Sequence, residues 1–127
     1  MFHYTVETDK SMDQAIESLE GALQEVKFGV LWQFDIKEKL NAKGLDFQQP
    51  YKVLEVCNPF EANRVLQENH MVGYFLPCKI VVYEEGGTTK IGLPKPTAMI
   101  SMVDDGNLKG IAEEIEATLI DVLDKVK

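Results

Sequence analysis

Apolar and polar residues alternate with a period of two in five short stretches of the chain, which is the pattern of half-buried β-strands. We therefore predict strands over residues 2–7, 28–35, 51–57, 79–85 and 88–93. The stretch 28–35 is the most apolar, so we expect it to lie at the centre of the sheet. Gly86 and Gly87 separate the last two stretches and can adopt the positive φ angles of a two-residue hairpin turn.

This turn fixes the register of the two strands that it joins. We expect the facing pairs to be Ile80 with Leu93, Val82 with Ile91, and Tyr83 with Lys90.

Apolar residues recur at helical spacing in three longer stretches, which predicts helices over residues 12–27, 59–70 and 107–127. Ser11 with Gln14 forms a capping box before the first of them. Asn58-Pro59 opens the second, because Asn caps helices and proline at the first helical position sacrifices no hydrogen bond.

Two further segments are less regular. Asp35 with Glu38 forms another capping box, and Gly44 is a suitable stop, so we predict a short helix over residues 36–43. The pattern leaves residues 97–103 open between a helical turn and a strand, and slightly favours the helix.

The order of these elements resembles a split β-α-β arrangement with an added hairpin strand and a C-terminal helix. We predict an α+β fold: a two-layer sandwich with a mostly antiparallel sheet of about five strands and helices on one face. The helices should cover the side of Phe28, Val30 and Trp32. The second face would then carry Leu31, Gln33, Tyr51, Val53, Glu55, Cys57, Val81 and Tyr83. That face is too apolar to lie bare.

Length and composition indicate one ordered domain over residues 1–127, with 45% hydrophobic and 27% charged residues. The net charge is −8 and the 13 basic residues are scattered, which argues against nucleic acid and anionic membranes as partners. No signal peptide or membrane-spanning segment is recognisable. Two cysteines are too few for a disulfide framework, so we expect a cytoplasmic protein with free thiols.

Two segments carry a family resemblance: residues 55–62, which contain Cys57-Asn58-Pro59 after a strand, and residues 76–84, which contain Leu76-Pro77-Cys78 before one. With these steps in the same order and separated by a helix, the chain resembles the bacterial and archaeal domain-of-unknown-function family 302 over nearly its whole length. The resemblance implies a compact α+β domain that self-associates. It implies no activity, because the family has no established one.

Cys57 and Cys78 are the only soft nucleophiles in the chain. Cys57 should lie near the N-terminus of the helix that begins at Pro59, where the helix dipole stabilises a thiolate. We favour the simpler interpretation that each cysteine is a small buried apolar residue. If the strands before and after that helix run parallel, the cysteines lie at opposite ends and cannot form a disulfide. The alternative is that residues 71–76, if extended, carry the chain back across the sheet.

No metal or cofactor is expected. His3 and His70 could join Cys57 and Glu55 around a metal, yet none of these residues has the spacing of known ligand motifs. Residues 86–89 lack the strand, loop, helix and lysine of a phosphate-binding loop, and a hairpin turn explains them.

We therefore predict a small protein that forms a homodimer, binds a small ligand, or does both, through the second face of its sheet. The candidate ligand-binding residues are Gln33, Glu55, Cys57, Asn58, Cys78 and Tyr83. The alternative is a thiol-dependent enzyme or redox sensor centred on Cys57. The sequence leaves open whether the protein is an enzyme.

Overall fold

All five strands belong to one antiparallel sheet with the order β1-β5-β4-β3-β2. The computed structural model describes residues 1–127. Its elements are β1 (His3–Thr8), α1 (Met12–Glu25), β2 (Gly29–Asp35), α2 (Ile36–Ala42), β3 (Tyr51–Cys57), α3 (Pro59–Glu68), the short 3-10 helix η1 (His70–Phe75), β4 (Cys78–Glu85), β5 (Thr88–Pro94), α4 (Pro96–Ile100) and α5 (Leu108–Val126). The predicted α+β class and antiparallel sheet are confirmed.

Local capping explains where the helices begin. The Ser11 and Gln14 side chains form the expected reciprocal capping box of α1. The Asp35 carboxylate accepts a hydrogen bond from the Glu38 amide at the start of α2. Helix α3 ends two residues earlier than predicted, because Asn69 adopts an extended conformation and caps η1 instead.

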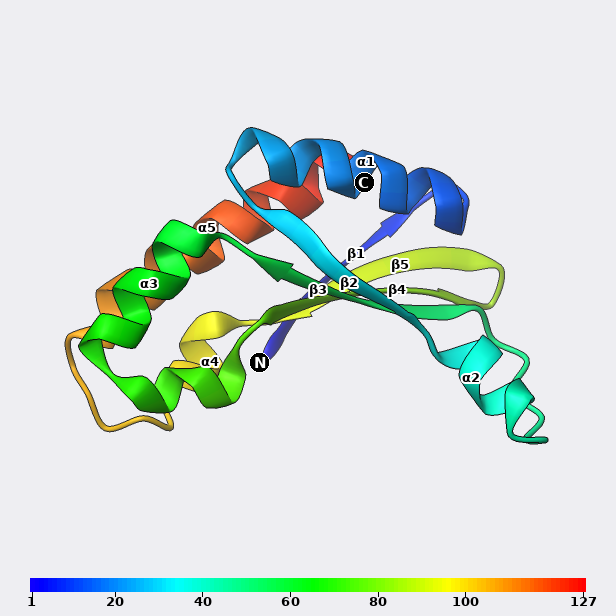
Figure 1. Cartoon of the computed structure of the whole chain (residues 1–127). Helices are drawn as coiled ribbons and strands as arrows, with labels where there is room; N and C mark the ends of the chain where they lie inside the picture. The colour runs from blue at the N-terminus through cyan, green and yellow to red at the C-terminus, as the bar shows by residue number, and fades with distance from the viewer.

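The main core lies between the sheet and the pair α1 and α5, which run side by side over one face (Figure 1). It includes the fully buried side chains of Leu19, Leu23, Leu54, Ile80, Ile91, Leu119 and Leu123. The hairpin register is the predicted one for Val82 with Ile91 and for Tyr83 with Lys90. The opposite face of the sheet has no helix over it (Figure 1).

A second, smaller core holds α3, η1, α4 and α5 together at one end of the sheet (Figure 1). Its buried members are Val65, Val72, Ile100, Val103, Leu108 and Ala112. Residues 97–100 of the segment that the pattern left open belong to the helix α4, which Pro96 and Ile100 anchor by their burial in this region.

Strand β2 is not central as predicted; it is an edge strand that pairs only with β3. A β-bulge between Val30 and Trp32 shifts its register by one residue. Because side chains alternate along a strand, this shift moves Trp32 away from the helices and places it opposite Glu55, where it is 56% exposed. Simple alternation through the bulge therefore assigned Trp32 to the wrong face.

Strands β3 and β4 are antiparallel, so the expectation that Cys57 and Cys78 lie at opposite ends of parallel strands is also wrong. Val56 pairs with Cys78, which makes the two cysteines near neighbours at one end of the sheet. Helix η1, instead of an extended segment, lies between α3 and the start of β4. Both cysteines are free.

Candidate functional site

The candidate site lies on the helix-free side of the sheet, which we call the open sheet face. Strand registers place on it residues that alternate with the core positions, and these include His3, Thr5, Glu7, Trp32, Phe34, Tyr51, Val53, Glu55, Cys57, Lys79, Val81, Tyr83, Glu85, Lys90, Gly92 and Pro94. Most of these side chains are half-buried by their neighbours. The face therefore combines apolar and aromatic groups with several polar and charged ones, some of which form ion pairs with each other.

A groove of about 420 Å³ crosses this face from β1 to β3. It is lined by Phe2, His3, Thr5, Tyr51, Lys79, Val81, Tyr83, Gly92, Leu93 and Pro94. Gly92 leaves room in its floor: a Cβ at this position would lie 2.8 Å from the Thr5 Oγ1 atom. The absence of a side chain at residue 92 thus allows β1 and β5 to pair closely while the groove stays open.

Three pairwise contacts fix the polar and aromatic side chains around the groove. His3 Nδ1 lies 2.9 Å from Thr5 Oγ1, and Lys79 Nζ lies 3.3 Å from a carboxylate oxygen of Glu55. The Tyr51 and Tyr83 rings are stacked, with centroids 5.1 Å apart. These contacts restrict the side-chain rotamers, which lowers the entropy cost of binding a ligand.

Glu55 and Tyr83 lie on this face, as the sequence predicted, but Gln33 does not. Beyond the β-bulge, Gln33 pairs with Leu54 on the helix side of the sheet and is exposed at its edge. Its assignment to the second face was wrong for the same reason as that of Trp32.

Cys57 and Cys78 lie away from the groove, where β3 ends and β4 begins. Together they line a small apolar cavity of about 20 Å³ beside α3. Burial raises the pKa of the Cys57 thiol, and burial together with the nearby Cys57 raises the pKa of Cys78 to about 11. Both side chains are therefore neutral thiols at physiological pH, with no thiolate at the start of α3.

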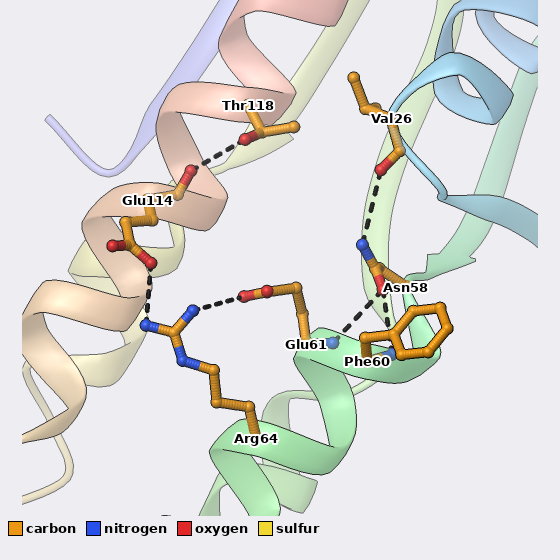
Figure 2. A network of polar contacts seen from close by, with 7 residues as sticks. All are labelled: Val26, Asn58, Phe60, Glu61, Arg64, Glu114 and Thr118. Carbon is orange, nitrogen blue, oxygen red and sulfur yellow. Dashed lines mark hydrogen bonds and ion pairs between the residues drawn. The ribbon is translucent and has the colours of Figure 1, made fainter.

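Both the oxygen and the nitrogen atom of the Asn58 side chain form hydrogen bonds (Figure 2). Its Oδ1 atom accepts hydrogen bonds from the amides of Phe60 and Glu61, at 3.0 and 3.3 Å, and so caps α3. Its side-chain amide donates to the Val26 carbonyl at 3.5 Å. Asn58 thus ties the start of α3 to the turn that follows α1 and does not reach the groove.

A bridge between helices completes this network. The Arg64 guanidinium of α3 contacts the Glu114 carboxylate of α5 at 2.9 Å and Glu61 at 3.5 Å (Figure 2). These acidic groups raise the pKa of Arg64. The pair joins two helices at the surface, and it offers no free cation to a ligand.

No group of three or more His, Cys, Asp or Glu side chains is arranged to hold a metal ion. None of the helices has the length and apolar character required to cross a bilayer.

Three of the ten residues that line the groove, Tyr51, Val81 and Tyr83, were expected on the second face from the sequence. The other seven, among them His3, Thr5, Lys79 and Gly92, were not. The alternation of residues 2–7 did place His3 and Thr5 opposite the core positions. The missing information was the pairing of β1 with β5, which connects segments nearly 90 residues apart.

A family model and a solved structure both point to the same protein family. The family model "Domain of unknown function DUF302" matches residues 4–126. A crystal structure of an uncharacterized conserved protein DUF302 from Bacillus stearothermophilus has 58% sequence identity and a TM-score of 0.98, covering 100% of this chain and 99% of that one. No curated protein matches the sequence.

Proposed function

Since the chain belongs to the DUF302 family, a family without an assigned activity, we propose from the geometry alone that it is a small-ligand binding module whose site is the groove on the open sheet face. We further propose that it acts in the cytoplasm as one domain over residues 1–127, in keeping with its two free cysteines.

The single observation that carries this proposal is the groove itself. Its volume of about 420 Å³ falls within the range of roughly 300 to 1,000 Å³ that small-molecule sites occupy. It also has their usual composition, because apolar and aromatic walls surround a few polar groups with fixed positions. No helix covers it, so a ligand can enter without a conformational change (Figure 1).

The experiment is an NMR titration of the whole protein with three naphthalene compounds of similar size: neutral naphthol, anionic naphthoate and cationic naphthylmethylammonium. Saturable shifts of the amides around Val81, Tyr83 and Gly92 with any of them are the expected result. Tyr83→Ala should weaken this binding because it removes a groove wall. Phe34→Ala, which removes an aromatic ring from the same face outside the groove, is the control. Absence of saturable groove shifts with all three compounds would overturn the proposal.

A second candidate function, self-association, is favoured by the part of the open sheet face that lies on β2, outside the groove. There Trp32 is 56% exposed and Phe34 follows it on the edge strand. Leu31, at the β-bulge of the same strand, is 62% exposed. Helix α2, which continues from this strand, has no buried residue and lies at the opposite end of the sheet from α3 and α4 (Figure 1). A short helix without buried contacts gains little stability by itself, and a second copy could supply them. The groove would remain free in such a dimer.

Trp32 is the only tryptophan, so its fluorescence reports directly on this surface. We expect light scattering to give twice the 14.3 kDa mass of one chain, and dilution to shift the Trp32 emission to longer wavelengths. Phe34→Lys should yield monomers, whereas Phe60→Lys, at an exposed aromatic residue of α3, should not. A monomer mass at micromolar concentration, with emission independent of concentration, would exclude the dimer.

The alternative of a thiol-dependent enzyme or redox sensor centred on Cys57 has less physical support. Its raised pKa works against the thiolate that such chemistry requires. Alkylation rates of the two thiols across pH test this point. Fast labelling of Cys57 with an apparent pKa well below the ordinary thiol value of 9.0 would support the alternative instead.

A further inference from the structure

The groove on the open sheet face differs in charge from the rest of the molecule. The chain has 21 acidic and 13 basic residues. The ten residues that line the groove nevertheless include Lys79 and His3 and no Asp or Glu. A ligand in the groove therefore meets a surface that lacks the acidic excess of the whole chain.

The polar side chains of the lining can all donate hydrogen bonds. The Glu55 carboxylate on the same face is already paired with Lys79, whose side chain is about half exposed and keeps N–H groups free for another acceptor. When the Thr5 hydroxyl donates to His3 Nδ1, the Nε2–H of His3 is free to donate as well. Tyr83, which also lines the groove, carries a further donor in its hydroxyl group. Donors of this kind match a ligand rich in acceptor oxygens.

The apolar part of the groove favours a flat ring. Val81 and Gly92 face each other across β4 and β5 and form a floor without a bulky side chain. The stacked rings of Tyr51 and Tyr83, with an interplanar angle of 23°, stand at one end of this floor. An aromatic ligand can lie on the floor and contact the edge or face of Tyr83, an arrangement that aromatic pairs prefer.

We propose that the groove selects planar aromatic anions, with aromatic carboxylates as the simplest members. The ring lies over Gly92 and Val81, and the carboxylate accepts hydrogen bonds from Lys79 and His3. This inference rests on the proposed ligand-binding function and narrows its ligand class.

Affinities for the three naphthalene compounds, measured by calorimetry on the whole protein, test the inference. Naphthoate should bind more tightly than naphthylmethylammonium and naphthol. Lys79→Ala should weaken naphthoate about tenfold, in line with the loss of one charge-assisted hydrogen bond, and leave naphthol unchanged. Lys79→Arg, which keeps the charge, should retain most of the affinity. Lys125→Ala, at a similarly exposed and ion-paired lysine on α5, is the matched control and should have no effect.

Two results would overturn the inference while leaving the groove as a binding site: a cation that binds as tightly as naphthoate, or a naphthoate affinity that Lys79→Ala does not change. Failure of all three compounds to bind the groove would remove both the inference and the proposed function. Circular dichroism of each variant verifies that the fold is intact, and the charge-retaining arginine variant separates the loss of charge from any local rearrangement.

Discussion

Thr5 and Gly92 face each other across β1 and β5 at such close range that a Cβ at residue 92 would lie 2.8 Å from the Thr5 hydroxyl oxygen. In folded proteins, a Cβ atom essentially never lies so close to another heavy atom. This one cross-strand pair therefore explains both the presence of a glycine inside a strand and the hollow in the floor of the groove.

Gly92→Ala should lower the free energy of unfolding by about 1 to 3 kcal/mol, because the new methyl group displaces Thr5. The double variant Thr5→Ala/Gly92→Ala should recover most of this loss, since the remaining contact is ordinary in length. Urea denaturation of the two single variants and the double variant measures the coupling. Additive effects would show that the Thr5 side chain is not what excludes a Cβ at residue 92.

Asn58→Ala should destabilise the protein by about 1 kcal/mol, because two amides at the start of α3 lose their hydrogen-bond acceptor. Asn58→Asp keeps that acceptor and should retain most of the stability, although it loses the contact with Val26. Urea midpoints compare the three proteins. An alanine variant as stable as the parent would mean that the cap contributes nothing, and Asn58 would then require another explanation.

Stability should fall as the pH rises from about 9 to about 11, in part because of Cys78. Its pKa in the folded protein is about 11, against 9.0 for a free thiol, so the unfolded chain loses this proton first and is favoured as the pH rises. Tyr4, whose pKa is raised chiefly by its hydrogen bond to Asp124, adds to the decline at higher pH.

The contribution of Cys78 appears as the difference between the parent and Cys78→Ala, because the other groups titrate in both proteins. This difference in unfolding free energy should be constant below pH about 9 and change only between about 9 and about 11. A difference that stays constant through this interval would indicate that the thiol ionises equally well in the folded state.

Cys78→Ser should destabilise the protein more than Cys57→Ser. Cys78 packs against the main core, where a serine hydroxyl lacks the hydrogen bond that it needs. Cys57 is partly exposed at the end of β3, and water can satisfy a hydroxyl there. Thermal unfolding of both variants, each compared with its alanine counterpart, measures the difference. If Cys57→Ser lost more stability than Cys78→Ser, Cys57 would be the cysteine in the drier environment.

The chain's local patterns determined most of its secondary structure. Alternation located all five strands, and the caps at Ser11, Asp35 and Asn58 located the helices that follow them. These signals are readable because a strand's pleat and a helix's first turn depend on residues only a few positions apart. The Gly86-Gly87 turn likewise set the register of β4 against β5.

The tertiary structure alone decided how these elements combine. The bulge in β2 moved Trp32 to the open sheet face and Gln33 to the helix side. Nothing in the composition of the strand indicates such an insertion. The pairing of β1 with β5, which builds the groove, and the antiparallel return of β4, which brings Cys57 near Cys78, join distant segments. Pairings of this kind are chosen by the packing of the whole core against α1 and α5, so no local stretch of sequence encodes them.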